Sequence, residues 1–312
     1  MDFGLEDNLA SLTIDLDNLN CYRRIHGLPE RKGADPTLDV AIERIANFLD
    51  AMGIKATLFA VASDLEKSGG SLTRLSVSGH EIANHSLYHD YRLAALPAVE
   101  IARDIKQSHE IISGVANRPV RGFRAPGYTQ SPVLMATIES LGYAYDSSLF
   151  PCPSYGLVKN MVRAFYRLKG RPSGSMPALF RTMFGIRKPY RTKPSLYWKD
   201  MGQGFLEMPI SVAPVTGLPV LGTLIATLPS LIFRALVLAP CHAETSLVNM
   251  ELHAMDFVEA NDRGVEHELA VLLPELHVPM EKRLLRYAGA VRWLSGRRKF
   301  VTLEDAVNYF PY

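Results

Sequence analysis

The chain has 312 residues, of which 47% are hydrophobic and 21% are charged. This composition is typical of a globular protein and excludes an intrinsically disordered one, and the length allows one large core. The formal net charge is +2, so the molecule as a whole is not a polycation, and we expect no nucleic-acid partner.

Cysteine usage and the first residues indicate a cellular compartment. Residues 1–7 are acidic and lack the basic start and apolar core of a signal peptide. Cys21, Cys152 and Cys241 are odd in number and show no Cys-x-x-Cys spacing. They favour reduced thiols and a cytoplasmic location over a disulfide framework.

Predicted strands and helices alternate along the chain. Strands are expected at 12–14, 55–61, 81–84, 121–124, 143–146, 206–212, 247–252 and 299–303, and helices at 39–52, 64–78, 97–116 and 131–141. Gly53 is a plausible helix stop, and 18–36 reads as a long polar loop. The alternation predicts parallel βαβ units.

Polar residues stand at the carboxyl ends of these predicted strands. They are Asp15, Asp17, His85, Arg124 and Asp146. Parallel α/β barrels place their chemistry at this end of the strands, so we expect these side chains to meet in one site.

Two short motifs in this set suit a metal ion. His85 and His89 are four residues apart, which on a helical turn puts both imidazoles on the same side. Asp15 and Asp17 alternate along an extended segment, so both point the same way. Two imidazoles and one carboxylate suit a divalent cation such as zinc, and the second aspartate is left to take a proton.

Taken together, five segments resemble the polysaccharide deacetylase (nodulation-protein-B homology) family, the family 4 carbohydrate esterases. The segments are 11–17, 79–89, 121–128, 145–150 and 252–257, and they occur in the family's order. The resemblance covers about 1–150 and 203–310. It implies a single α/β domain over 1–312, built as a distorted (β/α) barrel with fewer than eight complete units.

The resemblance also implies roles for individual residues. Asp17, His85 and His89 are expected to bind one divalent ion, most simply Zn²⁺, and Asp15 to act as the general base. Arg124 is similar to the arginine that orients this base.

The remaining roles concern the leaving group and the oxyanion. His253 is similar to the family's general acid, and Asp146 to the acidic residue that keeps that histidine charged. Gly127 and Tyr128 fall at the oxyanion and substrate positions. Here the chain departs from the family, because Gly127 stands where a tyrosine is common; its amide can still donate, but the role of the Tyr128 side chain is in question.

A basic and apolar insertion, about 150–202, lies outside the resemblance. Residues 147–199 contain eleven Lys or Arg and no Asp or Glu. Lys159, Arg163 and Arg167 recur every four residues, with an apolar face beside them, which predicts an amphipathic helix touching phosphates or an anionic membrane surface.

The segment 208–240 begins with an uncharged stretch, from 208 to 233. It is long enough to span a bilayer, but four prolines would break such a helix repeatedly. Shallow embedding in a membrane, or ordinary packing on the barrel or another subunit, are the other two interpretations.

These observations predict a metal-dependent hydrolase that removes an N-acyl group, most simply acetyl, from an amino sugar. We expect the sugar to be carried on a polyprenyl (di)phosphate, with the protein peripheral at the inner face of the cell membrane. One alternative is a cytosolic hydrolase of small amides or cyclic imides, and another is a non-catalytic membrane-associated scaffold. The sequence leaves the oligomeric state open.

Overall fold

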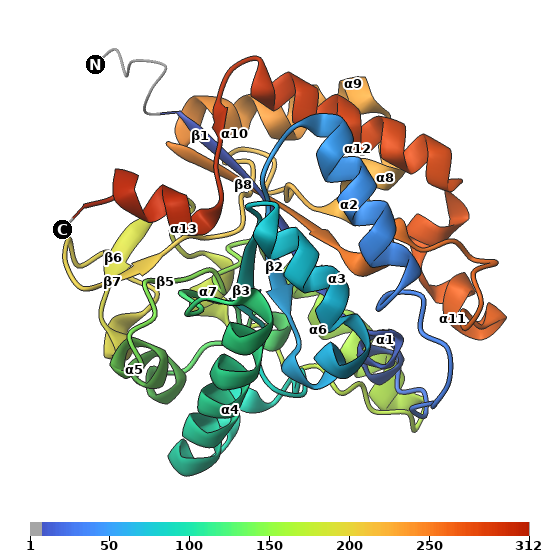
Figure 1. The fold of residues 1–312 in the computed structure, drawn as a ribbon, viewed down its shortest axis with the longest axis horizontal. Helices are drawn as coiled ribbons and strands as arrows, with labels where there is room; N and C mark the ends of the chain where they lie inside the picture. The colour runs from blue at the N-terminus through green and yellow to red at the C-terminus, as the bar shows by residue number, and fades with distance from the viewer. Residues whose placement is uncertain (1–7, 312) are drawn as a thin grey trace.

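The computed structural model describes residues 8–311, whose strands form one curled sheet (Figure 1). The strands are β1 (Leu9–Leu16), β2 (Thr57–Ala60), β3 (Glu81–Asn84), β4 (Gly122–Phe123), β5 (Tyr145–Asp146), β6 (Tyr190–Thr192), β7 (Phe205–Glu207), β8 (Leu247–His253) and β9 (Lys299–Phe300). Their order is β6-β7-β5-β4-β3-β2-β1-β8, and β9 also pairs with β1. All pairs are parallel except β6 with β7.

Helices cover the outside of the sheet. They are α1 (Leu19–Ile25), α2 (Val40–Met52), α3 (Leu65–Val77), α4 (Ala98–Ala116), α5 (Pro132–Ser140), α6 (Pro153–Leu168), α7 (Phe180–Met183), α8 (Gly222–Thr227), α9 (Ser230–Phe233), α10 (Ala239–Glu244), α11 (His267–Leu272), α12 (Met280–Ser295) and α13 (Leu303–Ala306). In Figure 1, α2, α3, α4 and α12 lie outside the central strands β1, β2 and β8.

Strand β1 is the centre of the core and is buried along its full length. It is flanked by β2 and β8, and its register sets Asp15 opposite Phe59 on one side and His253 on the other. Because all three strands are parallel, their carboxyl ends lie at the same edge of the sheet.

The gap between β7 and β8 is closed by an irregular segment, residues 208–221. Ser211 N–H donates to the Asn249 carbonyl of β8, and Glu251 N–H donates to the Val220 carbonyl. The barrel is therefore distorted, as the resemblance implied. The predicted strand 206–212 is wrong beyond Glu207, because the chain leaves β7 there to make this closure. The lack of charge in this segment follows from its position in the barrel wall.

Most other predicted elements are present with small shifts at their ends. Strand β3 has the predicted bounds, and α2 ends at Gly53, whose φ of 64° is left-handed. The predicted loop 18–36 is wrong in part, because α1 forms within it. Asn18 caps this helix by accepting from the Cys21 N–H, which sequence periodicity over seven residues did not reveal.

No helix among residues 8–311 is both long enough and apolar enough to cross a bilayer. The 208–233 stretch is divided into α8, α9 and the closing segment instead.

Candidate active site

Asp17, His85 and His89 meet at the carboxyl end of the sheet, and all three are buried. Asp17 Oδ1 lies 3.4 Å from His85 Nε2 and 3.1 Å from His89 Nε2. Asp17 follows β1, and His85 follows β3 directly, with its N–H donating to the Ala60 carbonyl of β2. The strand ends thus bring together two residues that are 68 positions apart in the sequence.

The histidine pair is not on a helical turn, contrary to the expectation from its spacing. Ser86 and His89 have φ angles of 74° and 53°, so the backbone is a tight loop. Side chains hold that loop: Asn84 Oδ1 accepts from the Ser86 N–H, and Ser86 Oγ accepts from the His89 N–H. Asp104 on α4 accepts from the Leu87 N–H. The two imidazoles therefore come together because hydrogen bonds from short polar side chains hold the loop between them, and not because they share a helical turn.

The donor set fits a divalent cation. Separations of 3.1 and 3.4 Å are close to the edge of a coordination tetrahedron with bonds of about 2.0–2.1 Å. Asp17 Oδ1 is buried and has no hydrogen-bond partner, which leaves it available to a cation. His85 Nδ1–H donates to the Arg124 carbonyl at 2.7 Å, which fixes the tautomer that turns the lone pair of Nε2 inward.

The surroundings favour a neutral His89 and an ionised Asp17, whereas the charges of Asp15 and Asp17 outweigh burial and raise the pKa of His85. Burial lowers the pKa of His89, which keeps that imidazole neutral. Burial acts to raise the pKa of Asp17, but the adjoining His89 and His85 outweigh it and hold the pKa well below its usual range.

Asp15 lies beside this trio and is held by Arg124. Its Oδ1 accepts from Arg124 Nη1 at 2.6 Å, and its Oδ2 is 3.6 Å from His85 Nε2. Burial acts to raise the pKa of Asp15, but the charges of Arg124, His85 and His253 lower it below the usual value. Asp15 is therefore an ionised carboxylate inside the protein.

Arg124 is fully buried, and each of its nitrogens has a partner. Nε and Nη2 donate to the carbonyl and the hydroxyl of Ser147, and Nη2 also donates to Thr13. Nη1 donates to Asp15 and to Glu251. The guanidinium lies 4.1 Å from the centre of the Phe59 ring. These contacts give Asp15 a fixed orientation.

His253, at the end of β8, lies next to Asp15, with a ring nitrogen within 4.8 Å of its carboxylate. Its Nε2 lies 3.2 Å from Tyr128 Oη, and the hydroxyl donates to Glu251 Oε1 at 3.0 Å. Burial acts to lower the pKa of His253, but Glu251, Asp15 and Asp17 raise it to about 9. The imidazole is therefore protonated at neutral pH.

Asp146 does not contact His253, contrary to the role that the resemblance implied. Its carboxyl belongs to a second buried cluster, where Gln130 Nε2 donates to Asp146 at 2.7 Å and to Glu207 at 2.8 Å. Burial raises the pKa of both carboxyls, and the two share a hydrogen bond. The carboxylates around His253 are Glu251, Asp15, Asp17 and Asp256, whose Oδ2 also accepts from the His253 N–H.

Glu251 lies in the site, although the sequence patterns above did not identify it. It is fully buried, contacts Arg124 and Tyr128, and its Oε2 has no hydrogen-bond partner. It stands two residues before His253 in a strand, so both side chains point to the same side of the sheet. The alternation that paired Asp15 with Asp17 would have found it.

Gly127 and Tyr128 form the turn beside the site, with φ angles of 60° each. A Cβ at Gly127 would lie 2.7 Å from the Tyr91 ring, so only glycine fits. The Tyr128 side chain reaches both His253 and Glu251. Although Gly127 stands where the family commonly has a tyrosine, the next residue, Tyr128, places its own hydroxyl in the site.

The basic residues of α6 do not form an outer face, contrary to prediction. Lys159 Nζ donates to the Gly127 carbonyl at 2.9 Å, and Arg163 Nε donates to the Ser175 carbonyl at 2.6 Å. Only Arg167 of the three is exposed. The apolar residues are exposed instead: Leu157, Val158, Met161, Phe165 and Leu168. Burial and the neighbouring Arg163 lower the pKa of Lys159 to about 8.

Comparisons with known proteins show which family and which solved structures the chain resembles. Residues 35–145 match the family model described as polysaccharide deacetylase. In this part the chain is similar to the polysaccharide deacetylases. The match contains His85, His89 and Arg124, while Asp17 precedes it and His253 follows it.

Solved structures share the fold of this chain over nearly its whole length. A Mycobacterium smegmatis protein assigned to the polysaccharide deacetylases has 15% identity and a TM-score of 0.60, covering 99% of this chain and 92% of its own. A Pseudomonas aeruginosa PAO1 protein assigned to the same class has 13% identity and a TM-score of 0.57, covering 98% and 92%. The PuuE allantoinase has the same identity and TM-score, covering 98% and 91%. Fold alone therefore does not select the substrate.

Proposed function

We propose that this chain is a metal-dependent hydrolase that removes an N-acyl group, most simply acetyl, from an amino sugar carried on a polyprenyl phosphate or diphosphate. The observation that carries the proposal is the juxtaposition of two groups of residues. Asp17, His85 and His89 offer three donors to one cation, and Asp15 beside them lies within 4.8 Å of the His253 ring.

Asp17, His85 and His89 would hold the divalent ion, most simply Zn²⁺. When bound there, the ion supplies Lewis acidity, which polarises the amide carbonyl and lowers the pKa of water. Asp15 accepts the proton of the attacking water, and Arg124 keeps its carboxylate ionised and oriented. The backbone N–H of Gly127 is placed to donate to the oxyanion in this mechanism.

His253 donates a proton to the leaving nitrogen as the carbon–nitrogen bond breaks. A pKa raised to about 9 keeps the imidazole charged at neutral pH, as a general acid must be. Tyr128 fixes the ring through its hydroxyl at 3.2 Å. The products are a carboxylate and a free amino sugar.

The lipid-linked substrate is supported by the surface around α6 and α7. Five apolar side chains of α6 are exposed, with Leu168 at 88%, and Phe180 of α7 is exposed at 75%. The segment from 147 to 199 that carries them has eleven basic residues and no acidic one. An apolar surface within a basic segment suits an anionic membrane, where the sugar carrier would be anchored.

The test uses purified metal-loaded protein and a polyprenyl-diphosphate-linked N-acetyl amino sugar in vesicles. We expect mass spectrometry to show the loss of one acetyl group, and no loss with His89→Ala, whose metal content should fall. A matched reaction with the free N-acetyl sugar measures how much the lipid contributes.

Either of two results would contradict the proposal and favour another function. Equal turnover of soluble amides or cyclic imides without lipid would favour a small-amide hydrolase, for which the allantoinase neighbour is a precedent of fold only. A metal-loaded protein that turns over neither lipid-linked nor soluble substrates, yet binds vesicles, would favour a membrane-associated scaffold.

A further inference from the structure

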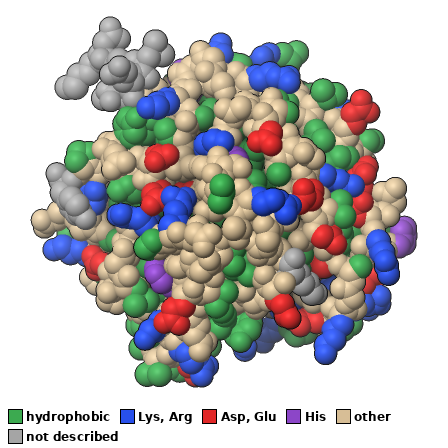
Figure 2. All heavy atoms as spheres, in the orientation of Figure 1, with side chains coloured by type: hydrophobic (Ala, Val, Ile, Leu, Met, Phe, Trp, Pro, Cys, Tyr) green, Lys and Arg blue, Asp and Glu red, His purple; other side chains and the backbone are tan. Residues whose placement is uncertain are grey.

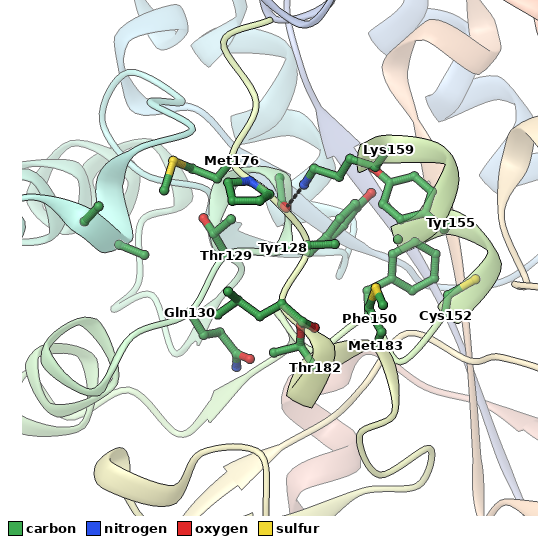
Figure 3. A pocket seen from close by; sticks show the side chains of 17 residues that line it. Tyr128, Thr129, Gln130, Phe150, Cys152, Tyr155, Lys159, Met176, Thr182 and Met183 are labelled. Carbon is green, nitrogen blue, oxygen red and sulfur yellow. Dashed lines mark hydrogen bonds between the residues drawn. The ribbon is translucent and has the colours of Figure 1, made fainter. Parts of the chain in front are cut away.

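A cavity of about 210 Å³ lies between α6, the 126–130 turn and the 176–183 segment (Figure 3). Most of its lining is apolar or aromatic, including Phe150, Tyr155, Met176 and Met183. Figure 3 shows Tyr155, Phe150 and Cys152 on one side of the cavity, with Met176, Thr129 and Gln130 on the other. The mechanism above leaves this space unused.

Tyr128 forms the wall between the cavity and the reaction centre. Its ring lines the cavity, while its hydroxyl contacts Glu251 at 3.0 Å and lies 3.2 Å from His253. The adjoining Gly127 also lines the cavity, and its carbonyl accepts from Lys159 Nζ. A group in the cavity is therefore one side chain away from the bond to be hydrolysed.

The cavity continues to the exposed apolar surface. Leu179 lines the cavity and is itself 39% exposed. Phe180 follows it in the chain, and α6 lines the cavity with Tyr155, Gly156 and Lys159 while exposing Leu157 and Val158. The cavity therefore borders an exposed apolar surface in a segment that has no acidic residue to repel an anionic lipid.

Charge and size select the occupant. With no acidic residue between 147 and 199, and with Lys159 in the lining, the surroundings favour an anionic molecule over a cationic one. Since an apolar cavity of about 150 Å³ holds a benzene molecule, 210 Å³ suits about six to ten carbon atoms.

We infer that this cavity binds the hydrocarbon chain of an anionic lipid, namely the first units of the carrier to which the sugar is attached. The inference rests on the proposed function, since it names where the lipid part of that substrate lies. The chain lies behind Tyr128, the head group lies toward the basic segment, and the sugar lies in front of Tyr128 at the strand ends.

The experiment measures binding of farnesyl phosphate, used below its aggregation concentration, by titration calorimetry. Ala178 lines the cavity, whereas Ala164 is exposed on α6 and does not line it. We expect Ala178→Phe to weaken binding about tenfold or more, because each CH₂ excluded from the cavity loses its transfer free energy, and Ala164→Phe to leave binding unchanged. Thr182→Leu, also in the lining, serves if Ala178→Phe does not fold.

Additional ligands separate the sources of affinity. Farnesol should compete with farnesyl phosphate, and inorganic phosphate alone should not. Equal binding to wild type and both cavity variants would overturn the inference, as would cavity-dependent binding of N-octanoylglucosamine without any binding of farnesyl phosphate. Binding is measured without turnover, so an inactive protein that still binds the lipid would refute the hydrolase and not the cavity.

Discussion

The strand-end site and the α6–α7 surface use charge in opposite ways. At the strand ends, charged groups are buried and each is fixed by named partners, as Arg124 is by Asp15, Glu251 and Ser147. On α6 and α7 the apolar side chains are exposed, and Arg167 is exposed among them. The first arrangement fixes individual protonation states, whereas the second leaves apolar side chains in water beside an exposed positive charge.

A third part of the surface shows that the α6–α7 arrangement is local. On the face seen in Figure 2, Lys and Arg are interspersed with Asp and Glu. For example, Arg74 of α3 and Glu43 of α2 form an exposed ion pair. Such a mixed surface suits contact with water, and it contrasts with the segment 147–199, which has eleven basic residues and no acidic one.

The largest effect is expected at the base. Asp15→Asn keeps the size of the side chain but cannot accept the proton of water, so we expect kcat to fall by about 10²–10⁴-fold. Metal content, measured by mass spectrometry of the element, should remain near that of the wild type. Asp17→Ala is the control, because it should lose metal as well as activity. Substantial activity in Asp15→Asn would show that another group is the base.

The next effect tests the other region. Arg167→Glu replaces an attraction of about 1 kcal/mol to an anionic surface with a similar repulsion, which predicts about thirtyfold weaker binding to phosphatidylglycerol vesicles. Sedimentation with vesicles measures this binding, and turnover of a soluble substrate should be unchanged. Lys106→Glu, an exposed reversal on α4, is the matched control and should bind as wild type. An equal loss in both variants would mean that net charge alone matters.

A smaller effect concerns the acid. Glu251 is first among the neighbours that raise the pKa of His253 to about 9, so Glu251→Gln should lower that pKa. Since activity requires protonated His253, the alkaline limb of the pH profile of kcat/KM should move to lower pH. At pH 9 we expect activity about tenfold below wild type. An unchanged alkaline limb, with only kcat reduced, would assign Glu251 a purely structural role.

The smallest effect concerns the separate cluster of Asp146 and Glu207. Burial raises the pKa of Glu207 well above its usual value. The folded state therefore favours the protonated form, and that stabilisation is complete below the unfolded pKa of about 4.5 and is lost as pH rises toward the folded value. Glu207→Gln should be nearly neutral in urea unfolding at pH 5 and flatten the loss of stability from pH 5 to 8. A slope equal to that of wild type would show that the proton lies elsewhere.

Most strands and helices up to residue 146, and the positions of several site residues at strand ends, could be predicted from the sequence. The edge strand β6 and its antiparallel pairing with β7 were not predicted. Alternating apolar and polar segments place Asp15, Asp17, His85 and Arg124 at strand ends, and parallel strands share one edge. The two-residue spacing between Glu251 and His253 also predicts that both side chains point to the same side of the sheet. The position of a strand and the side to which each of its side chains points follow from the pattern of neighbouring residues, so both can be predicted from the sequence.

Other features were decided only by the tertiary structure. The sequence shows that α6 is amphipathic, but its basic face turns inward because the carbonyls of Gly127 and Ser175 accept from Lys159 and Arg163. Likewise, Asp146 contacts Glu207 through the pairing of β5 with β7, and not His253 on β8. In both cases the partners are distant in the sequence, so no local pattern can specify which of two polar contacts forms.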